Sequence, residues 1–341
     1  MTQDLGYSTV FIIRDQPQQQ FHQWNLTVER QFFGDTVLSA SYAGSKGQHL
    51  INNFYYNPIQ RTAEQTAATG WDGYSEDSPG GPAGNGAVQL LFSNFDNSAS
   101  STYNSLQVRA QKRHTKGYSF IASYTLSRLT DDASSDWAGS WGGMDVKGQD
   151  YFTRFETDKS VSAGDITHRF SLSTVIELPS PEGGAAKAIL GDWMVSALFQ
   201  YATGLPFGID DSCYGFCSSA RSWTNRPDKI GDPNAGREDE QWVNADAYRS
   251  TWFDDAHPFG DSPRYDQDVR EPNFINLDLS VRKAIPVGED RRLEVRVDLF
   301  NALNRNQLAN PIREIGAGNF GIITRARSPN RQVQLGVRVT F

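Results

Sequence analysis

The last eleven residues of the chain alternate strictly between apolar and polar side chains. The apolar positions are Val333, Leu335, Val337, Val339 and Phe341, and the positions between them are Gln332, Gln334, Gly336, Arg338 and Thr340. A period of two places successive side chains on opposite faces of a β-strand. The pattern therefore predicts a strand with one apolar face. The chain ends on a bare aromatic ring, which would be an exposed apolar liability in a water-soluble protein.

Eight further segments alternate in the same way. They are residues 20–32, 36–45, 103–113, 118–129, 166–178, 193–203, 273–285 and 292–303. Each of these strands has one apolar face, and the other face carries mainly polar side chains. Short turns at alternate connections indicate antiparallel neighbours. The fold class that follows is all-β, with about nine strands.

The connections between these strands alternate in length. Short turns lie at residues 33–35, 114–117, 179–192 and 286–291, and long polar segments lie at residues 46–102, 130–165, 204–272 and 304–330. Compact soluble domains rarely carry a long loop at every second connection. Membrane barrels do, with short turns in the periplasm and long loops outside the cell. We therefore expect an antiparallel up-and-down transmembrane β-barrel, partial in this chain, with its C-terminus in the periplasm.

Aromatic residues on the apolar faces gather near the predicted strand ends. Tyr118, Trp193 and Phe341 mark the periplasmic end, and Trp24, Tyr42, Phe170 and Tyr201 lie nearer the outside. Such belts are typical of the two membrane–water interfaces. Val337, Val339 and Phe341 are the predicted signal for barrel assembly. Outer-membrane lipid, lipopolysaccharide and the barrel-assembly machinery are the expected partners.

Composition agrees with this expectation. Among 341 residues 38% are hydrophobic, and no run of eighteen apolar residues predicts a transmembrane helix. A net charge of −8 argues against binding to nucleic acid. The first six residues have neither the basic start nor the apolar stretch of a secretory signal, which an outer-membrane protein requires. We therefore expect the chain to be part of a longer protein of a Gram-negative outer membrane.

Several short phrases resemble the barrel of the TonB-dependent transporters, in particular the Oar-like branch with a carboxypeptidase-regulatory-like N-terminal domain. The phrases occupy residues 23–26, 42–47, 103–107, 123–127, 165–170, 203–207, 276–280 and 300–304, together with the terminal Phe341. Their order and spacing cover the chain from about residue 20 onward. The resemblance implies a barrel of about twenty-two strands that encloses an N-terminal plug and draws energy from TonB.

The chain departs from that pattern, since it contains no plug, no TonB box and only about nine strands. We therefore interpret residues 1–19 as the end of a preceding loop or strand, and residues 20–341 as the C-terminal part of the barrel. An open sheet of nine strands leaves unpaired backbone groups at two edges, which is costly in hydrocarbon. Alone, this chain is not expected to form a stable pore. The plug and the TonB system are expected in the full-length parent.

No catalytic group of residues is apparent, so the chain is not expected to be an enzyme, and no cofactor or metal is expected. The five histidines are scattered without metal-ligand spacing. Residues 316–321 match the letters of a dinucleotide-binding fingerprint, but β-branched residues follow them where a helix is required. We interpret this segment as a glycine-rich loop.

Charged residues are concentrated in the longest predicted loop. Its residues 205–272 include fourteen acidic and seven basic residues. The acidic clusters could bind Ca²⁺ or a cationic ligand, or they could solvate a mobile loop. Cys213 and Cys217 could form a local disulfide or a thiol pair for a metal. The loop tryptophans are candidates for binding a carbohydrate or peptide, or for packing loops together; they are Trp137, Trp141, Trp223, Trp242 and Trp252.

The expected function is therefore ligand capture by outer loops, with TonB-dependent uptake by the full-length parent. A surface adhesion or structural protein of the outer membrane is the first alternative, because long aromatic loops suit both roles. A soluble β-rich binding protein is the second alternative, and it predicts recovery in the aqueous fraction without detergent. The solute is not identified by the sequence, because specificity lies in the loops and in the plug.

Overall fold

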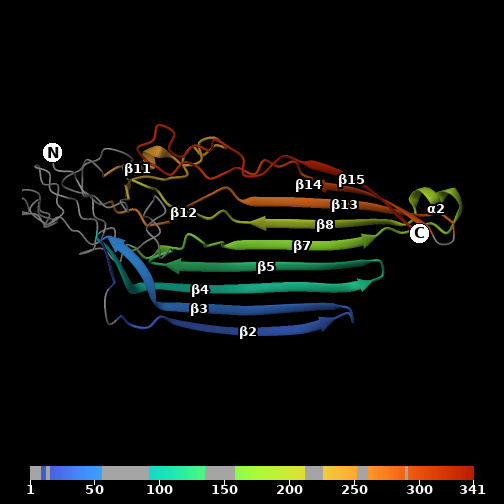
Figure 1. Ribbon diagram of the computed structural model, residues 1–341, viewed down its shortest axis with the longest axis horizontal. Helices are drawn as coiled ribbons and strands as arrows, with labels where there is room; N and C mark the ends of the chain where they lie inside the picture. Colours follow the sequence, from blue (N-terminus) through green and yellow to red (C-terminus); the bar gives the residue numbers. More distant parts are fainter. Residues whose placement is uncertain are drawn as a thin grey trace, which may run out of the picture.

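An antiparallel sheet of long strands dominates the structure (Figure 1). The computed structural model describes residues 9–12, 16–55, 92–134, 158–211, 226–251, 260–288 and 291–341. The long strands are β2 (Gln20–Phe32), β3 (Thr36–Tyr55), β4 (Phe92–Thr115), β5 (Tyr118–Asp131), β7 (His168–Glu177), β8 (Trp193–Ala202), β13 (Phe274–Pro286), β14 (Arg292–Phe300) and β15 (Gln332–Thr340).

These nine strands follow one another in the sheet in the order of the sequence, and each pairs antiparallel with the next. The predicted all-β meander is therefore confirmed. The short strand β6 (Ser160–Val161) extends the sheet beside β5, and β1 (Thr9–Ile12) pairs in parallel with β4. Within the described residues β2 and β15 pair on one side only, so the barrel is not closed.

The register brings the apolar positions of neighbouring strands into continuous rows. One row joins Val28, Ala40, Val108, Tyr124, Phe170, Tyr201 and Ile275. The row beside it on the other face joins Glu29, Ser39, Arg109, Ser123, Ser171, Gln200 and Asn276. A shift of one residue in any strand would exchange its two faces. The observed register therefore places the apolar positions of these strands on one face of the sheet.

That apolar surface is bare in the described structure. Leu26 is 67% exposed and Leu335 is 75% exposed, although both lie in the middle of their strands. On the opposite face, charged side chains pair with their neighbours, as in Arg296 and Asp298, whose Nε and Oδ2 atoms are 2.9 Å apart. Among the described residues, the sheet therefore has no covered hydrophobic core of its own, and its apolar side is exposed.

The short connections lie together at one end of the sheet (Figure 1). Gly34 and Gly117 adopt positive φ angles of 72° and 82°, which the tight turns require. Asp35 joins two of these turns, because its Oδ2 atom accepts from Thr115 Oγ1 at 2.5 Å and lies 3.0 Å from Lys112 Nζ. The hydrogen bonds from Thr115 and Lys112 lower the pKa of Asp35 to about 2.

The connection between β7 and β8 differs from the expectation of a plain turn, because it contains the helix α2 (Gly184–Leu190). This helix contains three alanines, and alanine has the highest helix propensity of all residues. At the other end of the sheet, β3 and β4 continue about ten residues beyond the predicted limits, to Tyr55 and from Phe92. The long segment between them is shortened accordingly.

Candidate ligand-binding layer at the long-loop end

The long connections fold against one another into a packed structure at the end of the sheet opposite the short turns (Figure 1). We call it the loop layer and define it as the described residues within 130–165, 204–272 and 304–330. Short strands build it: β9 (Pro206–Phe207) pairs with β12 (Asp266–Arg270), and β10 (Asp228–Lys229) pairs with β11 (Tyr248–Arg249). The 3₁₀ helix η2 (Ala245–Ala247) precedes β11.

A small hydrophobic core holds the loop layer together. Its buried members come from two separate connections and are Phe207, Ile209, Val243, Ala247, Tyr248, Val269 and Phe320. The rings of Tyr248 and Phe320 meet edge to face at 6.3 Å between centroids. Since the segments 204–272 and 304–330 both contribute, neither can be displaced without exposing apolar side chains of the other.

Buried arginines connect the loop layer to the ends of the strands. Arg264, which is 1% exposed, donates from Nη2 to the Asp131 carboxylate and from Nη1 to Ser134 Oγ at 2.9 Å. Arg226 Nη2 lies 3.0 Å from Asp158 Oδ1, and both side chains are buried. Removing one member of such a pair leaves an uncompensated buried charge. These contacts therefore hold the loop layer to the end of β5 and join its segments 130–165 and 204–272.

The chain crosses itself closely where the loop layer joins the sheet. The backbone N–H of Glu271 donates to Leu205 O at 2.9 Å, and Arg270 Nη1 donates to Gly204 O at 3.1 Å. A Cβ atom on Gly204 would overlap the backbone carbonyl of Glu271. Gly204 therefore permits a contact between two backbones that no other residue allows.

The described acidic residues of the segment 205–272 are largely engaged by neighbouring groups. Asp211 accepts from Thr251 N at 2.8 Å, and Glu271 Oε2 lies 3.1 Å from Arg327 Nη2. Burial raises the pKa of Asp211 and of Glu271, the latter against the opposing effect of Arg327. The segment is thus a structured layer where it is described. Asp254 and Asp255 lie outside the described residues.

No group of three or more metal-ligating side chains occurs in the part of the chain that the structure describes. None of its helices is long and apolar enough to cross a membrane. Residues 316–321 form turns, and the described residues that follow contain no helix. The interpretation of this segment as a glycine-rich loop, rather than a dinucleotide-binding motif, is therefore confirmed.

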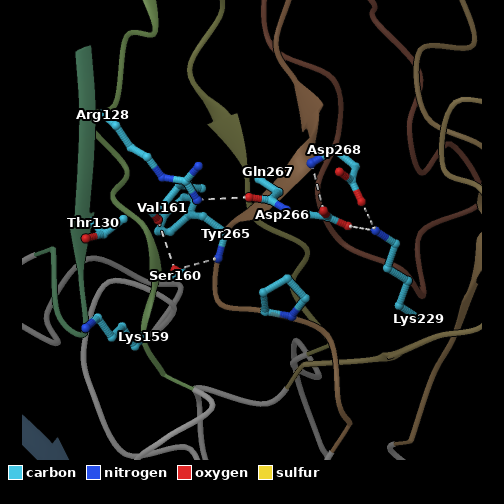
Figure 2. A pocket seen from close by; sticks show the side chains of 11 residues that line it. Arg128, Thr130, Lys159, Ser160, Val161, Lys229, Tyr265, Asp266, Gln267 and Asp268 are labelled. Atoms are coloured by element: carbon cyan, nitrogen blue, oxygen red, sulfur yellow. Dashed lines mark hydrogen bonds and ion pairs between the residues drawn. The ribbon is translucent and has the colours of Figure 1, made fainter. Parts of the chain in front are cut away.

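A cavity of about 410 Å³ lies between the outer end of β5, the strand β6 and the strand β12 (Figure 2). Arg128 extends from β5 across it, and its Nη2 atom donates to Gln267 Oε1 at 3.1 Å. Thr130, Ser160 and Lys159 line the side of β5 and β6. A second cavity of about 250 Å³ adjoins the first and shares Arg128 and Gln267 with it, so Arg128 stands where the two meet.

The cationic side chains that line the larger cavity differ in whether a carboxylate neutralises them. Lys229 Nζ lies 2.7 Å from Asp266 Oδ2 and 2.9 Å from Asp268 Oδ2. Burial acts to lower the pKa of Lys229, but its bonds to the two aspartates outweigh burial and raise it. Arg128 and Lys159 form no ion pair with any carboxylate in the described residues. The end of the cavity nearest β5 and β6 therefore carries excess positive charge.

The predicted tryptophan candidates are only partly visible. Trp242 is half-buried against the hydrophobic core of the loop layer, and its Nε1 atom donates to Arg270 O at 2.7 Å. The guanidinium of Arg237 lies 4.6 Å from its ring centroid. This indole packs loops together, which is one of the two roles considered. Trp137, Trp141, Trp223, Trp252, Cys213 and Cys217 lie outside the described residues and stay predictions.

The cavity residues were not among the sequence candidates. Arg128 has the same parity as Tyr124 and Leu126 on the apolar face of β5, so it interrupts the alternation, and Lys159 and Gln267 lie in segments without a recognisable motif. The one available signal was a basic residue at the outer end of a predicted strand. Such a residue is common, so the signal alone does not distinguish a site.

The comparisons with known proteins agree with this architecture. A family model described as an outer membrane beta barrel domain matches residues 2–334. The chain belongs to the outer-membrane β-barrel family. This membership places the protein in the outer membrane of a Gram-negative bacterium. No curated protein matches the chain.

Solved structures with a similar arrangement are outer-membrane transporters and receptors. The transporter YddB from Escherichia coli matches with a TM-score of 0.48 and 10% identity, over 98% of this chain and 34% of that chain. The ferric-catecholate import receptor Fiu from E. coli matches with a TM-score of 0.44 and 10% identity, over 96% and 28%. The FrpB iron transporter from Neisseria meningitidis matches with a TM-score of 0.42 and 10% identity, over 98% and 33%. The chain spans about a third of their length.

The lipid-facing side of this β-barrel protein should not tolerate charge. Leu279 lies on the apolar face of β13, between Ala197 of β8 and Leu299 of β14. We expect Leu279→Arg to destabilise the membrane-inserted barrel by about 2–4 kcal/mol, the cost of an arginine facing mid-bilayer lipid. Urea titration of the full-length protein in lipid vesicles measures this loss.

The matched control is Ser280→Arg, because the adjacent Ser280 lies on the polar face opposite Ser196 and Asp298. That variant should stay within about 1 kcal/mol of the parent, since its side chain reaches water or the neighbouring carboxylate. Equal losses from the two variants would contradict the assignment of the faces.

Proposed function

We propose that this chain is the C-terminal part of an Oar-like, TonB-dependent receptor barrel whose outer loops capture a solute at the cell surface. The loop layer carries this proposal. It is packed around its own core, tied to the strand ends by buried ion pairs, and holds a polar cavity at the end of the barrel that faces outward. A barrel that only filled the membrane would have no need of such a layer.

In the full-length parent, a plug within the barrel and the TonB system would turn capture into energised uptake. The barrel-assembly machinery would insert the parent, with Val337, Val339 and Phe341 on the terminal strand as its recognition signal. Lipid and lipopolysaccharide would surround the apolar face. The role proposed for the chain is capture, without catalysis.

Growth experiments test uptake. Deleting the gene of the parent should abolish growth on one nutrient source in a panel of single carbon, iron or phosphorus sources, and deleting TonB should abolish growth on the same source. A parent in which residues 206–270 are replaced by a short glycine-serine turn should remain in the outer membrane and show the same defect.

Attachment of the cells to surfaces is measured in parallel. If attachment is lost while growth on every source is unchanged, the protein acts in adhesion, and the uptake proposal is overturned.

A further inference from the structure

The cavity between β5, β6 and β12 has the features of a site for an anionic saccharide. We propose that it binds a sugar carrying a carboxylate or phosphate, with Arg128 and Lys159 holding the anionic group. This inference rests on the proposed receptor function and names the class of its solute.

The size of the cavity suits such a solute. Pockets for small ligands span about 300–1,000 Å³, and the larger cavity here has about 410 Å³. The adjoining cavity of about 250 Å³ extends the site past Arg128. A linear saccharide could occupy both, with an acidic group at the shared boundary.

The charges of the cavity select for an anion. Lys229 is held between Asp266 and Asp268, and these three groups together carry a net charge of −1. With Arg128 and Lys159 added, the lining of the larger cavity has a net charge of +1. Arg128 is held by Gln267, whose amide is neutral. This bond uses one N–H of a guanidinium that has five, and the remaining donors can pair with a carboxylate or phosphate through two parallel bonds. The fork of Arg128 is thus positioned without being neutralised.

The rest of the lining suits hydroxyl groups. Thr130 contributes a hydroxyl to the lining, and Asp268, whose side chain is 57% exposed, is bonded to Lys229 through one carboxylate oxygen only. The Ser160 hydroxyl is engaged by Val161 O and Tyr265 N. Sugar hydroxyls both donate and accept, so they can satisfy this mixture of donors and acceptors. A hydrophobic ligand would leave the Thr130 hydroxyl and the remaining donors of Arg128 without partners, at a cost for each.

Calorimetry on the purified full-length parent tests the proposal. The acidic probes are trigalacturonate and glucose 6-phosphate, and the neutral probes of matched shape are the methyl ester of trigalacturonate and glucose. We expect at least one acidic probe to bind about tenfold or more tightly than its neutral counterpart. Arg128→Gln should remove most of this preference, and Lys159→Gln part of it.

The control variant is Arg305→Gln, because Arg305 is an exposed arginine of the loop layer outside the cavity. Its affinity should equal that of the parent. Equal binding of acidic and neutral probes, or equal effects of Arg128→Gln and Arg305→Gln, would overturn the assignment of the cavity. A growth defect of the gene deletion would persist in that case, so the two proposals fail separately.

A different observation concerns the helix α2 at the short-turn end. Two side chains on the lipid-facing side hold its C-terminal end: Trp193 Nε1 donates to Ile189 O at 2.9 Å, and Lys283 Nζ donates to Ile189 O at 3.0 Å and to Gly191 O at 2.8 Å. Trp193 and Lys283 are direct partners in the register of β8 and β13 and share the apolar face with Val195 and Val281. The end of α2 therefore lies on the side of the sheet that faces lipid.

The apolar residues of this helix are uncovered. Ile189 and Leu190 are 66% and 60% exposed, and no residue of α2 is buried. We infer that α2 is an interfacial helix that inserts these two side chains into the periplasmic leaflet of the outer membrane. The helix continues the lipid-facing surface of the barrel, and tryptophan and lysine are the residues that mark a membrane interface.

Photo-crosslinking tests whether the C-terminal end of α2 contacts lipid. A benzophenone amino acid at position 189 of the parent, irradiated in outer-membrane vesicles, should yield phospholipid adducts detectable by mass spectrometry. The control position is 187, since two residues separate side chains by about 200° around a helix. Position 187 should give several-fold less lipid adduct. Equal lipid adducts at the two positions, or only protein adducts at 189, would overturn the inference.

Discussion

Replacing Arg264 by methionine should unfold the loop layer while the barrel stays intact. The substitution leaves the Asp131 carboxylate, whose side chain is 6% exposed, without its cation, and it removes donors to Ser134 Oγ and Asp158 O. Breaking a buried ion pair from one side costs about 3–5 kcal/mol. Amide hydrogen exchange should accelerate throughout the loop layer by about two orders of magnitude or more, and heat-dependent gel mobility of the barrel should not change.

Two further variants separate charge from packing in this prediction. Arg264→Met combined with Asp131→Leu removes both charges and should recover most of the lost protection, because apolar residues of similar volume can replace a buried pair. Arg305→Met, at an exposed position of the same layer, should have little effect. If the double variant exchanges as fast as Arg264→Met alone, the buried charge is not the reason for the loss.

The second large effect is expected from a single methyl group at Gly204. In Gly204→Ala the new Cβ overlaps the backbone carbonyl of Glu271, and a backbone cannot rotate away as a side chain can. The two segments must separate, which breaks the hydrogen bond from Glu271 N to Leu205 O. We expect a loss of about 3 kcal/mol or more, at the upper end of overpacking effects. Rapid trypsin cleavage after Arg264 or Arg270 in intact cells reports it.

Gly318→Ala is the matched substitution. Gly318 lies in the same layer, but a Cβ atom there meets no other atom within 4 Å. This variant should resist trypsin as the parent does. Equal sensitivity of the two alanine variants would show that the crossing at Gly204 is not the cause.

The strands could be predicted because the lipid imposes a local rule on them. Every second residue faces hydrocarbon, so the apolar pattern of β2 or β15 is visible within ten residues. The predicted limits of β2 agree with the structure, whereas β3 and β4 continue past the region where alternation is required. The helix α2 carried a signal in its three alanines, but it is only seven residues long.

The loop layer could not be predicted because its contacts follow no period. Arg264 and Asp131 are separated by 133 positions, and neither residue differs locally from an ordinary surface charge. Gly204 lies within the phrase 203–207 that carries the family resemblance, but its structural role depends on the close approach of the Glu271 backbone. Trp242 was correctly placed in a loop, yet its indole packs against the core, and nothing in its local sequence indicates which role it takes.

The large separation between partners has a consequence for biogenesis. Asp131 ends β5, and Arg264 lies in the connection that follows β8. In the sheet, β7 and β8 follow β5, and this arrangement brings the two residues together. Contacts of this kind bear the full entropy of closing a long loop and form late. A folded loop layer on the surface of the mature protein thus indicates that insertion of the barrel is complete. A receptor stalled halfway would display loose, protease-sensitive loops, and a cell could recognise it by that feature alone.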